Sequence, residues 1–194
     1  MEKEHYHGGR PRSEQARSAI LDAVDDLLVE VGYAAMTMKG ISERAGVSRQ
    51  TLYRWWSHKA EILFEASAAD AEEELEISPA GTPLDDLRAY LEALVRFLTD
   101  SPAGAAYRAL LGEAQHDSAV GELLSTKDLL GDSARVVIER ALGKDTLPIP
   151  IDQATALLIG PTFFWILSGR NPEELVPLEL AKDFMSDLRA RQLR

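Results

Sequence analysis

The sequence predicts an all-α fold of about nine helices, and three observations support this prediction. Apolar residues recur at helical spacing along most of the chain, and the pattern is clearest over Ile20, Val24, Leu27, Leu28 and Val31. No window shows the alternation of apolar and polar residues that is typical of a strand. Segments rich in proline and glycine, such as 78–83, separate the helical stretches.

The first predicted helix begins after Ser13, whose side chain can cap it, and ends at Gly32. Residues 1–12 before it are expected to form a disordered arm. Its Arg10 and Arg12 are candidates for the DNA minor groove, where narrow A·T tracts attract arginine. The alternative is a solvated tail that only adds positive charge.

The stretch 37–59 predicts two short helices joined by a tight turn, with a third helix starting just beyond. Thr37 can cap the first helix and Ser48 the second, because each hydroxyl can accept from a free backbone N–H. Gly46 lies where a helix ends in a left-handed residue, a conformation that only glycine adopts without steric cost. In the second helix, the apolar side chain of Leu52 is expected to face the core. This is the pattern of a helix-turn-helix.

The outward side chains of that second helix combine cations with aromatics and contain no acid: Arg49, Gln50, Thr51, Tyr53, Arg54 and Trp55. Arginine can bond a guanine edge in bidentate fashion and glutamine an adenine edge, while tyrosine and lysine hold phosphates. We therefore expect this surface to enter a major groove. The alternative is a helical hairpin with a basic face that binds no nucleic acid.

These residues resemble a known signature. In order and spacing, the DNA-binding motif of the TetR (tetracycline-repressor-like) family is matched by Thr37, Lys39, Ile41, Ala45-Gly46-Val47-Ser48, Thr51-Leu52-Tyr53 and Lys59. The resemblance covers about residues 14–64. It implies operator binding as a homodimer, with Thr37, Ser48 and Lys59 on phosphates and Lys39 on a base or phosphate. His58 stands where the family usually has a capping Ser, Asn or Asp, so the start of the fourth helix stays open.

The net charge of −11 is compatible with DNA binding because of its distribution. Residues 1–64 contain nine Lys or Arg and nine Asp or Glu, so the whole excess of acid belongs to residues 65–194. Acidity away from the DNA-facing surface restrains non-specific adhesion and favours solubility.

Beyond the motif, the chain predicts a helical bundle. A bridging helix begins near Lys59 and runs to Glu76, and further helical segments cover 84–98, 107–114 and 120–142. We therefore expect a disordered arm (1–12), a three-helix DNA-binding domain with the helix-turn-helix (13–58), and a C-terminal domain for ligand binding and dimerisation (59–194).

The segment 153–169 is apolar nearly all round, which predicts burial on two sides. Pro161 is expected to kink or break it. Together with a last helix at 177–191, it predicts a four-helix dimer interface. The interface residues are predicted to be Leu158, Pro161, Phe164, Ala181, Phe184, Met185 and Leu188. The alternative is a core helix of a monomer.

The sequence predicts no enzyme, no cofactor and no metal site. It contains no Gly-rich phosphate loop, no paired histidines at helical spacing around an acid, and no nucleophile elbow. The absence of cysteine excludes disulfides and thiolate zinc sites. His5 and His7 could pair on a metal, but two histidines on a floppy tail make a poor site.

The resemblance also implies a pocket for a small apolar or aromatic effector in the bundle. The candidate lining residues are Tyr90, Phe97, Tyr107, Gln115, His116, Thr162, Phe163 and Trp165. Taken singly, each aromatic is better explained as plain core.

Together these features predict a dimeric, sequence-specific regulator, most often a repressor in this family, that a ligand releases from its operator. The alternatives are a ligand-independent or structural DNA-binding protein, an activator, or a ligand-binding protein with a vestigial helix-turn-helix. No apolar run reaches the ~18 residues of a membrane helix, and the N-terminus lacks the apolar segment of a signal peptide. We therefore expect no membrane partner and a bacterial cytosolic location, nucleoid-associated when bound.

Overall fold

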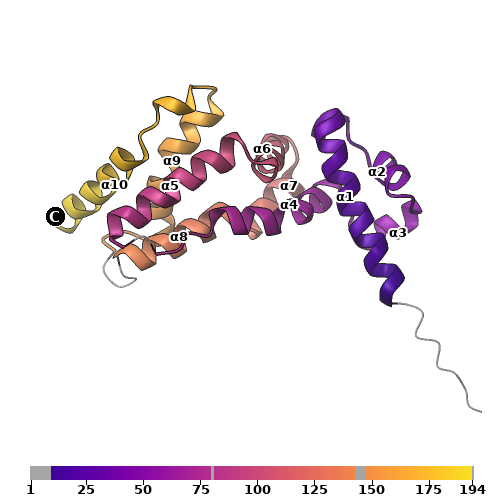
Figure 1. Cartoon of the computed structure of the whole chain (residues 1–194), viewed down its shortest axis with the longest axis horizontal. Coiled ribbons are helices and arrows are strands. Elements are labelled where there is room, and N and C mark those ends of the chain that lie inside the picture. The colour runs from indigo at the N-terminus through magenta and orange to yellow at the C-terminus, as the bar shows by residue number, and fades with distance from the viewer. Residues whose placement is uncertain (1–9, 80, 143–146, 194) are drawn as a thin grey trace, which may run out of the picture.

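The computed structural model describes residues 10–79, 81–142 and 147–193, and within them every regular element is a helix (Figure 1). The elements are α1 (Arg10–Ala35), α2 (Met38–Arg44), α3 (Arg49–Tyr53), α4 (Lys59–Leu75), α5 (Pro83–Thr99), α6 (Pro102–Ala114), α7 (Ser118–Thr126), α8 (Leu129–Leu142), α9 (Ile151–Leu167), the 3-10 helix η2 (Pro172–Glu174) and α10 (Pro177–Gln192). The all-α prediction is confirmed.

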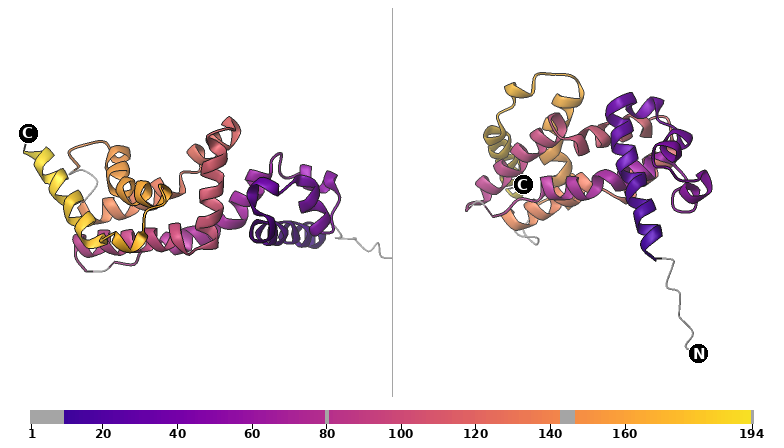
Figure 2. Two further views of the ribbon diagram at one scale, coloured as in Figure 1. Left: turned by 90° about the horizontal axis from the view of Figure 1, so that it is seen from above. Right: turned by 45° about the vertical axis from the view of Figure 1, so that its right-hand side comes forward.

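The molecule is elongated, with α1–α3 at one end and α9 and α10 at the other (Figures 1 and 2). Helix α4 leads from the first end into the bundle, and it packs against α1 as well as against α5, α6, α7 and α8. A change in the position of α4 therefore affects both α1 and the helices of the bundle that pack on α4.

The helix-turn-helix forms as its local sequence predicts. The Thr37 hydroxyl accepts from the N–H of Gly40 at 3.0 Å, and the Ser48 hydroxyl accepts from the N–H of Thr51 at the same distance. Gly46 adopts a φ of 66°, in the left-handed region that disfavours a side chain. Each capped N–H is one that the helix itself leaves without a partner, so these three residues fix where α2 and α3 begin and turn.

The small N-terminal core does not end at the helix-turn-helix. Ile20, Ile41 and Leu52 are fully buried in it, and the same cluster includes Leu110 of α6 and Val120 of α7. Packing therefore crosses the predicted domain boundary between residues 58 and 59, and that boundary stays a prediction.

The bundle is built around α5. Its leucines at 87, 91, 94 and 98 recur every three or four residues and are all buried, and α5 packs against α8, α9 and α10. Tyr90 lies on the same buried face, where its hydroxyl contacts the Ser133 hydroxyl at 3.0 Å. Burial raises the pKa of Tyr90 far above its usual value.

Three element boundaries differ from the prediction. Helix α1 starts at Arg10, three residues before the expected cap Ser13. The predicted helix 120–142 is two helices, α7 and α8, because Asp128 accepts from the N–H of Gly131 at 3.1 Å and starts a new helix. Helix α9 runs through Pro161 without a break.

Candidate nucleic-acid interface

Helix α3 and its C-cap residue present an exposed cationic surface, which we call the reading face: Arg49, Gln50, Tyr53 and Arg54. The buried Leu52 anchors the helix from behind. Neither Arg49 nor Arg54 forms an ion pair with any described residue, and their guanidinium groups lie over the neighbouring rings of Tyr53 and Trp55 instead. Two guanidinium groups without a carboxylate partner, beside an amide, supply N–H donors. Acceptor atoms on base edges and phosphate oxygens can bond to such donors.

The two cationic residues of α2, Arg44 and Lys39, differ in their ion pairs. Arg44 bonds the carboxylates of Glu30 and Asp26 on α1. The hydrogen bond from Arg44 lowers the pKa of Glu30, and the pair fastens α2 to α1. Lys39, at the start of α2, stays exposed and has only a 3.6 Å contact with Glu43, so it remains available for a base or phosphate.

Trp55 lies at the inner edge of the reading face, half-buried, and its contact with DNA stays a prediction. Helix α3 ends at Tyr53, and Trp55 packs edge-on against Trp56 with 5.5 Å between the ring centroids. On the outside, the Arg54 guanidinium lies 4.7 Å from the centroid of the Trp55 ring. Trp55 therefore connects the reading face to the interior behind it.

The start of α4, which the sequence left open, lies at Lys59. His58 occupies the cap position but makes no capping hydrogen bond. Instead the Glu61 carboxylate accepts from the N–H of Ser57 at 2.8 Å and from the Ser57 hydroxyl at 2.9 Å. The acid in the first turn thus reaches back to the chain before the helix, as in a capping box.

Lys59 points into the domain. Its Nζ donates to the carbonyls of Tyr33 at 2.8 Å and Met36 at 3.0 Å, and it lies 4.1 Å from the centroid of the Tyr33 ring. Burial, followed by repulsion from Glu113 and Asp117, raises the pKa of Tyr33 to about 12, so its ring is neutral in this contact. Lys59 holds the α1–α2 connection against α4, and phosphate binding by it stays a prediction.

Replacing Lys59 with methionine keeps the aliphatic stem and removes the donors. We expect the free energy of unfolding to fall by about 1–3 kcal/mol, because two carbonyls lose their partner, and urea denaturation measures this. Lys39→Met is the matched control and should change stability by less than about 0.5 kcal/mol. An unchanged stability for Lys59→Met would show that the internal bonds are unimportant.

The other residues predicted to contact phosphates form hydrogen bonds close to their own position in the chain. The Thr37 and Ser48 hydroxyls cap their helices, and the Thr51 hydroxyl lies 2.9 Å from that of Ser48. Arg10 and Arg12 fall in the first turn of α1, not in an arm, and their side chains, like residues 1–9, lie outside the described part of the chain.

The residues predicted to line a ligand pocket are divided between the bundle core and sites outside it. Tyr90, Phe97 and Thr162 are fully buried in the bundle core. Tyr107 packs beside Phe97 at 6.0 Å between centroids, and Trp165 donates to the carbonyl of Asn171. Phe163 is a half-buried member of the same core, and Gln115 and His116 are exposed beyond the end of α6.

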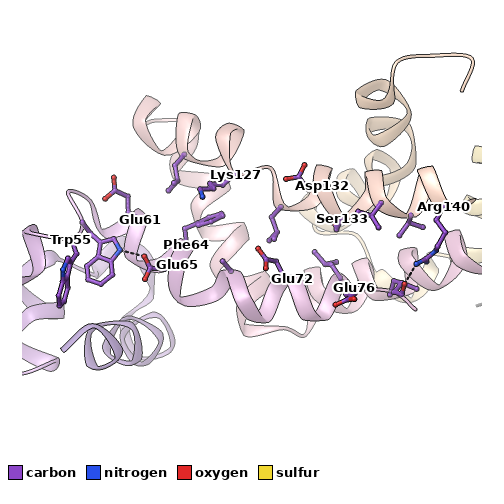
Figure 3. A pocket seen from close by; sticks show the side chains of 18 residues that line it. Trp55, Glu61, Phe64, Glu65, Glu72, Glu76, Lys127, Asp132, Ser133 and Arg140 are labelled. Carbon is purple, nitrogen blue, oxygen red and sulfur yellow. Dashed lines mark hydrogen bonds between the residues drawn. The ribbon is translucent and has the colours of Figure 1, made fainter. Parts of the chain in front are cut away.

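A cavity of about 920 Å³ lies elsewhere, between α4, α7 and α8 (Figure 3). It includes none of the eight predicted residues. Its lining from α4 and the C-cap of α4 consists of Glu61, Phe64, Glu65, Ala68, Glu72, Leu75 and Glu76, and Trp55 and Trp56 line one end. The spacing of these α4 residues places them on one helical face, a signal that was readable in the sequence but was missed.

The predicted dimer residues divide into two groups. Leu158, Ala181, Phe184 and Leu188 are at most 5% exposed and belong to the core of their own protomer, so their assignment to an interface is corrected. Met185 is half-buried beside them. Pro161 and Phe164 lie on the outer face of α9, where Phe164 is 62% exposed.

Comparison with known proteins agrees with this geometry. Residues 20–66 match the family model "Bacterial regulatory proteins, tetR family", and residues 77–183 match "Tetracyclin repressor-like, C-terminal domain". The HTH-type transcriptional regulator YdeS of Bacillus subtilis, itself uncharacterized, is 34% identical over 82% of both chains. The HTH-type transcriptional repressor KstR of Rhodococcus jostii is 32% identical over 45% of this chain and 43% of its own.

Solved structures show the same fold. Salmonella enterica GusR superposes with a TM-score of 0.67 at 20% identity, covering 94% of this chain and 98% of its own. A TetR transcriptional regulator from Agrobacterium tumefaciens gives 0.59 at 22% identity, with 90% and 92% covered. Within the described residues, no helix combines the length and apolarity that crossing a membrane requires. The chain is not an enzyme but belongs to the TetR family of transcriptional regulators.

Proposed function

We propose that this regulator is a dimeric repressor that binds a pseudo-palindromic operator and is released from it by a small ligand. The observation that carries the DNA-binding part is the reading face, where Arg49 and Arg54 are exposed and unpaired while nearby Arg44 is neutralised by two acids. Cations without partners on a capped, anchored helix are suited to a polyanion.

The outer face of α9 supports the dimer. Leu157, Phe164 and Leu167 are 38%, 62% and 43% exposed, and Gly160 and Pro161 lie between them on the same side. Large apolar side chains gathered on one exposed face mark an interaction surface, and a two-fold contact of such a face with itself is the common solution. Because α9 lies at the far end from α3 (Figure 1), such a dimer leaves both reading faces free.

Helix α4 provides the route for ligand control. It lines the 920 Å³ cavity and also packs against α1. Trp55 lies at the end of the cavity, and the Arg54 guanidinium stacks over its ring. A ligand in the cavity can therefore alter both the tilt of α4 and the position of a reading-face arginine. It weakens DNA binding only if it binds the displaced arrangement more tightly.

Repression is the sign of regulation that the relatives favour, because the KstR proteins of three organisms are repressors by name. A repressor of this kind acts in the cytosol, on the nucleoid.

Selection of bound sequences from a random duplex pool tests the proposal. We expect an inverted repeat whose half-site centres are about 34 Å, one helical turn, or a multiple apart. Enrichment of single half-sites would contradict the dimer, and retention of unrelated sequences would indicate a structural DNA-binding protein. Absence of any salt-dependent binding would contradict DNA recognition altogether.

A further inference from the structure

The cavity between α4, α7 and α8 has a size and a wall that suit a small molecule. Its volume of about 920 Å³ falls within the range of about 300–1,000 Å³ that is usual for ligand sites. Along α4 it extends from Glu61 to Glu76, which corresponds to a helix rise of about 22 Å. The cavity is therefore an elongated groove.

One end of the groove is aromatic. Trp55, Trp56 and Phe64 line it (Figure 3). The Trp56 indole is fixed, since its Nε1 donates to the Glu65 carboxylate at 3.0 Å, and Trp55 is held edge-on against it. Aromatic faces carry negative charge density and attract cations as well as flat apolar groups. This end can hold the apolar body of a ligand.

The charges along the groove are predominantly negative. Its ionisable lining residues are five acids, Glu61, Glu65, Glu72, Glu76 and Asp132, and two bases, Lys127 and Arg140. Arg140 is already neutralised by Asp86 at 2.8 Å, and Asp132 by Arg135 at 2.8 Å. Arg17 neutralises Glu65 from outside the groove.

The acids that remain lie along one face of α4 and at its C-cap, Glu61 near the aromatic end and Glu72 and Glu76 near the other. Glu72 and Glu76 are four residues apart, and their carboxylates form no hydrogen bond or ion pair with any described residue, while the Glu61 carboxylate accepts only from uncharged groups of Ser57. Lys127 is the opposing unpaired cation, and it lies on the opposite wall from Glu72 and Glu76 (Figure 3). Three uncompensated carboxylates against one ammonium favour a positively charged occupant.

We propose that this groove binds an amphipathic organic cation, with its aromatic or apolar body against Trp55 and Trp56 and its positive charge near Glu72 and Glu76. Such a ligand relieves the repulsion between adjacent carboxylates and covers apolar wall at the same time. An anion of the same shape would meet the carboxylates without a partner. Binding itself does not depend on DNA, whereas its use as a release signal rests on the proposed function.

Two probes of matched shape and opposite charge test this proposal: tetraphenylphosphonium and tetraphenylborate. Titration of the full chain without DNA, followed by calorimetry and by tryptophan fluorescence, should show the phosphonium binding at least about tenfold more tightly than the borate. Raising the salt concentration should reduce that ratio, because the charges are partly exposed. Equal affinities, or tighter binding of the borate, would overturn the proposal.

Variants locate the site. Glu72→Gln combined with Glu76→Gln should weaken phosphonium binding about tenfold and leave borate binding unchanged or stronger. Glu73→Gln is the matched control, because it removes an exposed acid of the same helix that does not line the groove, and its affinity should be that of the parent chain. A double variant that binds the phosphonium like the Glu73→Gln chain contradicts the assignment.

Operator binding is measured separately, which distinguishes the two proposals. Phosphonium binding by a chain that selects no DNA sequence would contradict the proposed function and leave the groove assignment standing. Normal operator binding without any phosphonium binding would overturn the groove assignment alone.

Discussion

Phe164→Asp is expected to convert the proposed dimer into monomers and to lower operator affinity by about 10²–10⁴-fold, because two linked half-site contacts become one. Phe164 is 62% exposed on the outer face of α9, so the protomer can accommodate the charge in solution. In a face-to-face dimer the same carboxylate would be buried at an apolar contact, where desolvation of the charge is costly even with the Arg170 guanidinium, 4.7 Å from the Phe164 ring centroid, beside it. Analytical ultracentrifugation and operator titration measure the two effects.

Val29→Asp is the control for this experiment. Val29 is 83% exposed on α1, far from α9, and its replacement should leave the sedimentation of the dimer unchanged. A dimeric Phe164→Asp chain would show that α9 is not the interface.

The buried Phe184 should behave differently from Phe164. Phe184→Ala should lower the free energy of unfolding by about 3–5 kcal/mol, a loss of stability that does not depend on dimerisation.

Arg49→Ala is expected to lower operator affinity by about 1–3 kcal/mol, which is about 5–150-fold, and to relax the preference at one base pair of each half-site. The guanidinium of Arg49 has no carboxylate partner among the described residues and lies on the exposed side of a helix that Leu52 anchors. Its loss therefore removes a base contact without disturbing the fold. Sequence selection with the variant measures the relaxed position.

Arg96→Ala separates recognition from total charge. Arg96 is an exposed arginine of α5, away from α3 in Figure 1, so its loss changes the net charge equally but should leave affinity and selectivity intact. Undiminished selectivity for Arg49→Ala would contradict the assignment of the reading face.

Local features of the structure were predictable because they depend on neighbours in the chain. A hydroxyl at Thr37 or Ser48 meets the N–H three residues on in any context, and Gly46 takes a left-handed conformation because few other residues can. The repeat of leucines on α5 likewise indicated a buried face before any partner was known.

Side-chain partners across the fold were not predictable in this way. Lys59 looked like a free phosphate ligand, and only the approach of the α1–α2 connection showed that its ammonium is bonded to two carbonyls. Trp55 follows the end of α3 and packs edge-on against Trp56, an arrangement of the two rings that the sequence alone does not show. Phe184 has the pattern of an interface residue and is core instead.

The sequence by itself determined the family, the helical class, the turn chemistry of the helix-turn-helix and the cationic face of α3, because each follows from residue type and short-range spacing. Only the tertiary structure decided which apolar residues face the protomer core and which face outward on α9. It also decided that α4, α7 and α8 together enclose a groove. The physical reason is that burial and cavity shape are set by helices distant in sequence, and one helix pattern is compatible with several arrangements of its neighbours.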